Sequence, residues 1–142
     1  MRISDVLRNK GGTVSTVGPD MTVGELLDGL VTQNIGAMVV VGPAGLIGIV
    51  SERDVVRKLH ELGVDLLGRP VSEIMTTQVI TCAPSDSVNS LTALMTTNRV
   101  RHVPVIDAGE LAGIVSIGDV VKTRMEELQT QQEQLEAYIT QG

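Results

Sequence analysis

The pattern of apolar and polar positions predicts short strands and amphipathic helices in a fixed order. Val14–Val17 predicts a strand, and apolar residues at helical spacing after Thr22, a suitable N-cap, predict a helix. Ala37–Val41 is a continuous run rich in β-branched residues, as in a strand buried on both faces, and Leu46–Ser51 predicts the strand that returns after a turn with glycine and proline. A second helix is expected to begin near Glu52. The predicted unit is therefore β-α-β-β-α.

The same unit occurs twice. A shift of 65 residues aligns Val14–Leu59 with Val79–Arg124 without a gap, and about 15 of the 46 pairs are identical. A shorter echo precedes each copy, at Ser4–Leu7 and Ser72–Met75. Its offset is 68 residues, which indicates three extra residues in the first copy, around residues 11–12. The duplication is the strongest signal in the sequence.

Two such repeats are expected to share one fold. A unit of about 50 residues seldom buries enough apolar surface alone, so we expect the copies to pack through their strands and helices with pseudo-twofold symmetry. This packing leaves two equivalent clefts between them. We assign residues 1–68 to the first repeat, 69–124 to the second, and 119–142 to an extended C-terminal helix and tail.

Composition and charge exclude several classes of protein. With 42% apolar and 20% charged residues the chain is not disordered. It has one Tyr and no Phe or Trp, and without the four glutamates after Arg124 it keeps 11 basic against 13 acidic residues, so we expect no nucleic-acid partner. No apolar run approaches the roughly 18 residues of a membrane span, and the first residues lack a signal-peptide core. A single cysteine, Cys82, forms no internal disulfide, so we expect a reducing cytoplasm.

Two stretches near the ends of the repeats resemble a known family. Gly48–Asp54 (GIVSERD) and Gly113–Asp119 (GIVSIGD) are similar to the closing motif of the CBS (cystathionine β-synthase) domain, and Arg99–Asp107 is similar to its middle strand. The resemblance covers about residues 2–124, and the tail is similar to that of small stand-alone CBS-pair proteins. It implies an α/β (α+β) fold of two CBS repeats packed as a pseudo-twofold pair in a disc-like homodimer.

The resemblance also implies a function. The family binds AMP, ADP, ATP, or in some members NAD(H) or S-adenosylmethionine, in clefts between the repeats, and serves as a sensor of energy or redox state for a partner protein. The family meets the anion with basic side chains near the middle strand, which match Arg99, Arg101 and His102 here. The corresponding positions of the first repeat are Asn34, Gly36 and Ala37, so we expect weaker phosphate binding there.

The candidate nucleotide-binding residues therefore fall into two unequal clefts. In one, the motif of the second repeat meets basic side chains of the same repeat and a threonine across the interface, namely Ser116, Gly118, Asp119, Arg101, His102 and Thr16. In the other, the motif of the first repeat meets a pair of small residues and the equivalent threonine, namely Ser51, Arg53, Asp54, Gly36, Ala37 and Thr81. The cleft with Asp119 has more cationic donors, so we predict that it takes the phosphorylated ligand.

Each candidate also has a purely structural interpretation. Ser51-x-x-Asp54 and Ser116-x-x-Asp119 have the spacing of a helix capping box. In the functional interpretation the aspartate accepts both hydroxyls of a ribose, while the serine and the first N–H groups of the helix hold phosphate. The basic residues have an alternative as a solvated strand end, and His102 as a hydrogen-bonded structural histidine. The two threonines have one as turn hydroxyls.

No pattern in the sequence indicates an enzyme or a metal site. It contains no nucleophile–base pair, no paired catalytic carboxylates and no GxxxxGK[ST] loop. Two widely separated histidines, His60 and His102, and Cys82 do not make a metal site. We expect no catalytic residue, no metal and no required cofactor, and an adenosine nucleotide as the regulatory ligand.

The C-terminal segment continues as a helix with a narrow apolar stripe. Its a/d positions alternate at spacings of four and three residues, at Val121, Met125, Leu128, Gln132, Leu135 and Ile139. The helix either folds back on its own body or docks on a second copy in a homodimer. The second alternative is favoured because apolar turns that protrude alone are unstable.

The sequence thus favours a non-catalytic regulatory module. A nucleotide bridging both repeats shifts their relative orientation, and an unidentified protein target reads the change. The alternative is a constitutive dimerisation or interaction scaffold whose clefts are vestigial.

Overall fold

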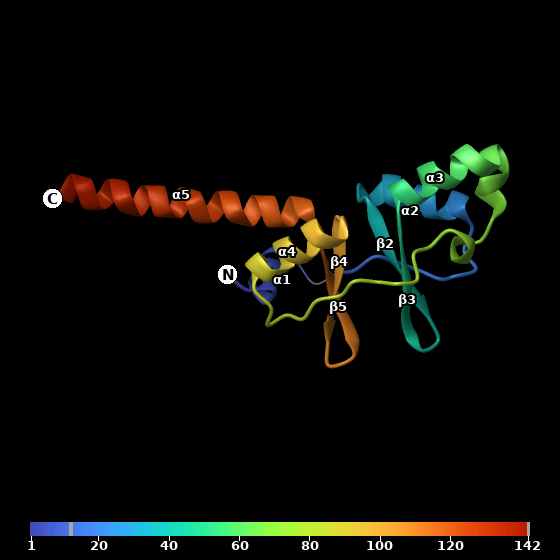
Figure 1. Ribbon diagram of the computed structural model, residues 1–142, viewed down its shortest axis with the longest axis horizontal. Coiled ribbons are helices and arrows are strands. Elements are labelled where there is room, and N and C mark those ends of the chain that lie inside the picture. Colours follow the sequence, from blue (N-terminus) through green and yellow to red (C-terminus); the bar gives the residue numbers. More distant parts are fainter. Residues whose placement is uncertain (12, 142) are drawn as a thin grey trace.

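The computed structural model describes residues 1–11 and 13–141 and arranges them as two similar halves, with one long helix projecting from the second half (Figure 1). Gly12, in the predicted insertion, and Gly142, at the end of the predicted tail, lie outside the described residues. No helix among the described residues is long and apolar enough to cross a membrane.

Both halves contain the predicted unit. The elements of the first half are β1 (Thr16–Val17), α2 (Val23–Gln33), β2 (Ala37–Gly42), β3 (Gly45–Ser51) and α3 (Glu52–Leu62), followed by the 3-10 turns η1 (Gly63–Gly68) and η2 (Val71–Glu73). The second half has α4 (Val88–Asn98), β4 (His102–Asp107), β5 (Glu110–Ser116) and α5 (Ile117–Gln141), and α1 (Ile3–Lys10) precedes both halves. The second copy of the first strand is reduced to a single parallel bridge between Cys82 and Val105.

The two hairpins have the same register. β2 pairs with β1 in parallel and with β3 in antiparallel orientation, and β4 pairs antiparallel with β5. Val40 lies opposite Gly48, and the equivalent pair 65 residues later is Val105 opposite Gly113. Both hairpins shift register immediately after this pair. The duplication seen in the sequence therefore extends to the details of strand pairing.

The helices that lead into the hairpins begin and end in the same way. Thr22 Oγ1 accepts the N–H of Glu25 at 3.2 Å, and Ser87 Oγ accepts the N–H of Ser90 at 3.0 Å. Each helix ends at a residue in the left-handed region, Asn34 for α2 (φ 53°) and Arg99 for α4 (φ 55°). These turns direct the chain into β2 and β4.

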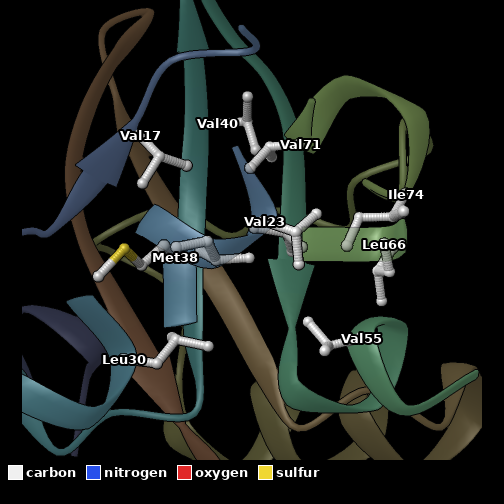
Figure 2. Close-up of a cluster of buried hydrophobic side chains, with 11 residues drawn as sticks. Val17, Val23, Leu30, Met38, Val40, Val55, Leu66, Val71 and Ile74 are labelled. Atoms are coloured by element: carbon white, nitrogen blue, oxygen red, sulfur yellow. The ribbon is translucent and has the colours of Figure 1, made fainter. Parts of the chain in front are cut away.

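Each half has its own core of aliphatic side chains. Figure 2 shows the first core, in which side chains of α2, β2, α3 and η1 meet. The buried residues that the sequence assigns to the helix faces lie in these cores: Val23, Leu26 and Leu30 in the first, and Val88, Leu91 and Met95 in the second. The predicted apolar faces of α2 and α4 are therefore confirmed.

The segment before each repeat packs against the half that precedes or follows it in an exchanged manner. Ile3 and Val6 of α1 are buried in the core of the second half, whereas Val71 and Ile74 are buried in the core of the first half. The backbone follows the same pairing, since the Ile3 N–H donates to Asp86 at 2.9 Å. The repeat boundaries 1–68 and 69–124 stay a prediction, but the packing units cut across them.

Helix α5 leaves the body after its first turns. Val120 and Thr123 are buried, and this part of α5 contacts α1, α4 and β5. Figure 1 shows the rest of the helix running away from both halves. Its a/d side chains stay exposed, Met125 at 65% and Leu135 at 60%. The alternative in which this helix folds back on its own body is therefore wrong, while docking on a second copy stays a prediction.

Candidate functional site

A cleft of about 790 Å³ lies between the two halves. The first half contributes the entry to β2, the end of β3 and the first turns of α3. The second half contributes the loop between α4 and β4, together with residues 78–80, and Thr76 completes the wall. The volume is within the range of small-molecule sites in proteins, about 300–1,000 Å³.

Four arginines from both halves line this cleft. Arg53 and Arg57 lie one turn apart on α3, and Arg99 and Arg101 come from the loop before β4. The carboxylates in the same wall are Glu52 and Asp54. The six ion pairs found within residues 1–11 and 13–141 use other cations, so all four guanidinium groups remain available to an anion.

The small residues of the first half make room for the basic residues of the second. A Cβ added at Gly36 would lie 3.2 Å from His102 Cε1, so the imidazole fits against the bare backbone of residue 36. Burial lowers the pKa of His102, and the positive charges of Lys10 and Arg101 lower it further against the opposing effect of Asp119 and Glu52. His102 is therefore neutral at pH 7 and adds a hydrogen-bonding group, rather than a charge, to the cleft.

Asp54 combines a structural role with a place in the cleft wall. Its Oδ2 accepts the N–H of Ser51 at 2.9 Å, and Ser51 Oγ accepts the N–H of Asp54 at 3.4 Å, so the capping box is present. The other oxygen, Oδ1, accepts only a long hydrogen bond of 3.4 Å from the hydroxyl of Thr76. A carboxylate has about four acceptor positions, so Asp54 keeps capacity for further donors from the cleft.

Asp119 has the same capping geometry but a different surrounding. The N–H of Ser116 donates to Asp119 Oδ2 at 2.8 Å, and Lys10 Nζ lies 2.7 Å from the same oxygen. Partial burial opposes ionisation of this carboxyl, but the hydrogen bonds from Lys10 and Ser116 and the charge of Lys10 outweigh it and lower its pKa. Asp119 is thus an ionised carboxylate already paired with a cation of the same chain.

The predicted division of basic residues between the clefts is wrong. Arg101 and His102 were expected beside Asp119, but both line the cleft of Asp54. His102 does lie opposite Ser116 in the sheet. However, the loop that carries these side chains faces the equivalent loop of the first half, where Gly36 and Ala37 have almost no side chain to fill the space. The cationic donors therefore favour the cleft of Asp54 for a phosphorylated ligand.

The cleft unites eight of the predicted site residues and leaves out five. It is lined by Ser51, Arg53, Asp54, Gly36, Ala37, Arg99, Arg101 and His102. Ser116, Gly118 and Asp119 lie at the β5–α5 junction instead. Thr16, in β1, and Thr81, just before Cys82, are exposed and are not part of the lining.

Sequence reasoning missed four polar residues at these two sites. Arg57, Thr76 and Gln78 line the cleft, and Lys10 binds Asp119. Arg57 follows Arg53 by four residues, a spacing that places both on one face of α3. The signal for Lys10 and Gln78 was the short echo before each repeat, because its offset of 68 residues aligns these two positions.

The remaining titratable candidates do not form a reactive or metal site. Burial, with a contribution from Asp86, raises the pKa of Cys82 to about 12, so its thiol is protonated at neutral pH. Among residues 1–11 and 13–141, no group of three or more His, Cys, Asp and Glu side chains is arranged to hold a metal ion.

Comparison with known proteins places this geometry in context. The CBS domain profile matches residues 3–61 and 71–126. CBS domain-containing protein CBSX3, mitochondrial, of Arabidopsis thaliana is 39% identical and spans 99% of this chain and 72% of its own. The crystal structure of the CBS-domain containing protein ATU1752 from Agrobacterium tumefaciens superposes with a TM-score of 0.85 at 43% identity, covering 87% of this chain and 99% of that one.

Two similar structures contain adenosine ligands. The CBS domain pair of protein MJ0100, crystallised with 5′-methylthioadenosine and S-adenosyl-L-methionine, is 25% identical with a TM-score of 0.77, covering 87% of this chain and 98% of that one. CBSX2 in complex with AMP is 25% identical with a TM-score of 0.71, covering 88% of this chain and 96% of that one.

Proposed function

The chain belongs to the CBS domain family, and on that premise we propose that it is a non-catalytic regulatory module that binds a phosphorylated adenosine in the cleft of Asp54. The observation that carries the proposal is the union, in one cleft, of four arginines without a carboxylate partner and a carboxylate with spare acceptor capacity. A nucleoside phosphate needs both. The complexes of CBSX2 with AMP and of MJ0100 with methylthioadenosine support the ligand class.

Each part of the ligand has a complementary wall. The ribose hydroxyls donate to Asp54, a charge-assisted interaction that a neutral acceptor would not match. The phosphate takes Arg53 and Arg57 from one repeat and Arg99 and Arg101 from the other. The adenine packs on the aliphatic side chains of the lining, which are Ile49, Val56, Val79, Ile80 and Val100.

Because the arginines come from both halves, the ligand is expected to regulate through their relative position. A phosphate bound to all four guanidinium groups holds α3 of the first half against the α4–β4 loop of the second. Without it the like charges repel. A target protein that contacts both halves would distinguish these two states only through such a difference.

The dimer is a further part of the proposal. Two copies pair through the exposed a/d positions of α5, where Val121, Met125, Leu128, Leu135 and Ile139 would bury one another and the polar Gln132 would favour a two-stranded pairing. A single cysteine, buried and protonated, fits a reducing compartment, and we propose the cytoplasm.

One observation favours the scaffold alternative. Asp54 and Asp119 both complete capping boxes, a role that explains both residues without any ligand. In that case partner binding and oligomeric state would be the same with and without nucleotide.

The experiment is a calorimetric titration of the chain with AMP, ADP, ATP, NADH and adenosine, with Asp54→Asn as the test variant. Asp119→Asn is the matched control, because it perturbs the equivalent capping box and leaves the cleft intact. We expect the phosphorylated adenosines to bind, Asp54→Asn to lose binding, and Asp119→Asn to retain it. Binding to none of these ligands at millimolar concentration would refute the function.

A further inference from the structure

The residue that completes the Asp119 site differs in charge from its counterpart in the cleft of Asp54. The short echo before each repeat aligns Leu7 with Met75 and Lys10 with Gln78. The structure bears out the first pair, because a Cβ added at Gly113 would lie 2.6 Å from Leu7 and one added at the equivalent Gly48 would lie 2.7 Å from Met75. The segments 4–10 and 72–78 thus occupy equivalent places.

Lys10 binds the two positions whose equivalents form the ligand wall in the first cleft. Its Nζ lies 2.7 Å from Asp119 Oδ2 and 2.7 Å from the carbonyl oxygen of Ile114. The residues 65 positions earlier are Asp54 and Ile49, which both line the cleft. The ammonium group of Lys10 therefore lies where the second repeat would otherwise offer its carboxylate to a ligand.

In the first cleft the same two groups meet a neutral partner. Thr76 donates its N–H to the carbonyl of Ile49 at 2.8 Å and its hydroxyl to Asp54 Oδ1 at 3.4 Å. A hydroxyl at that distance leaves the negative charge of Asp54 uncompensated. The cation at 2.7 Å compensates that of Asp119, and both side chains are largely shielded, with 33% and 23% exposure.

We propose that Lys10 is an internal occupant of the second site, so that each chain binds one nucleotide, at Asp54, although the fold provides two equivalent positions. This inference rests on the proposed function. The residue at position 10, and at its equivalent 78, decides which site is open. A ribose reaches Asp119 only when the ion pair with Lys10 breaks, which weakens the second site by about fivefold or more.

The test is the stoichiometry of AMP binding by isothermal titration calorimetry. We expect one AMP per wild-type chain and two per Lys10→Gln chain, because glutamine gives the second site the residue that the first has. Lys10→Arg keeps the cation and is expected to stay at one. Lys58→Gln, which removes an exposed lysine paired with Glu61, is the matched control and is also expected to stay at one.

The reciprocal variant tests the same idea in the first cleft. Gln78→Lys is expected to weaken AMP binding there by about fivefold or more, because the new cation competes for Asp54. Adding Asp119→Asn to Lys10→Gln is expected to return the stoichiometry from two to one, which locates the new site. Thermal unfolding of every variant confirms that each chain is folded.

The outcomes separate this inference from the function on which it rests. If the wild-type chain binds one AMP and Lys10→Gln still binds one, the inference fails and the proposed function stands. Two AMP in the wild-type chain, or loss of a site in Lys10→Gln, would make Lys10 a ligand group and overturn the inference. If neither chain binds any AMP, the proposed function fails and the inference fails with it.

Discussion

Replacing Arg101 by glutamine is the most informative perturbation of the cleft, because it removes a cation that the second repeat supplies to the site of the first. The change keeps the length of the side chain and a hydrogen-bond donor but removes the charge. Arg101 lines the cleft without a carboxylate partner, so its loss leaves no new unpaired acid behind.

The magnitude follows from the geometry. A hydrogen bond to a charged group contributes about 1.5–3 kcal/mol. Arg101 is exposed and shares the anion with three other arginines, so the lower end, about 1.5 kcal/mol, applies. That energy corresponds to about a tenfold weaker Kd for AMP. Adenosine lacks the phosphate and should bind both chains equally.

Calorimetric titration at constant salt, with AMP and adenosine on both chains, measures this difference. Arg69→Gln is the matched control, since Arg69 pairs with Glu73 outside the cleft lining. An equal loss for AMP and adenosine, or no loss for either, would refute the assignment of Arg101 to the phosphate.

Three further predictions concern stability and assembly. Folding lowers the pKa of His102, so its contribution to the free energy of unfolding is complete above about pH 6.5 and declines as the pH falls below that value; in His102→Gln a urea titration from pH 7 to 5 should show a smaller decline. Leu66→Ala removes a fully buried side chain of the first core and should cost about 2–5 kcal/mol by urea unfolding, whereas a cost below 1 kcal/mol would contradict the packing in Figure 2. Leu135→Lys should convert the proposed dimer to a monomer in analytical ultracentrifugation without lowering the melting temperature of the body, because this residue is 60% exposed on the projecting part of α5; a wild-type chain that is already monomeric would contradict the proposed pairing.

The fold was predictable because the duplication repeats every local signal. Apolar periodicity gave α2 and α4, and the β-branched run gave the buried strand β2. The same pattern 65 residues later left little doubt about the architecture. The exchange of α1 and η2 between the cores was not predictable, because an amphipathic segment such as Ile3–Lys10 fits either half equally well by pattern alone.

The site was predictable in its residue types but not in its partners. The motif pointed to Asp54 and Asp119, and both appear at the expected helix starts. The direction of Arg101 depends on how two equivalent loops meet near the pseudo-twofold axis, where the missing side chain of Gly36 decides which cleft is filled. The contact of Lys10 with Asp119 spans 109 residues, and no local pattern encodes such a pair.

The crystal structure of the chain grown with AMP tests the central claim most directly. We predict electron density for the nucleotide in the cleft between the halves, with the ribose hydroxyls on Asp54 and the phosphate in contact with guanidinium groups of both repeats. Density at Asp119 with the ion pair to Lys10 broken and the cleft of Asp54 empty would contradict it.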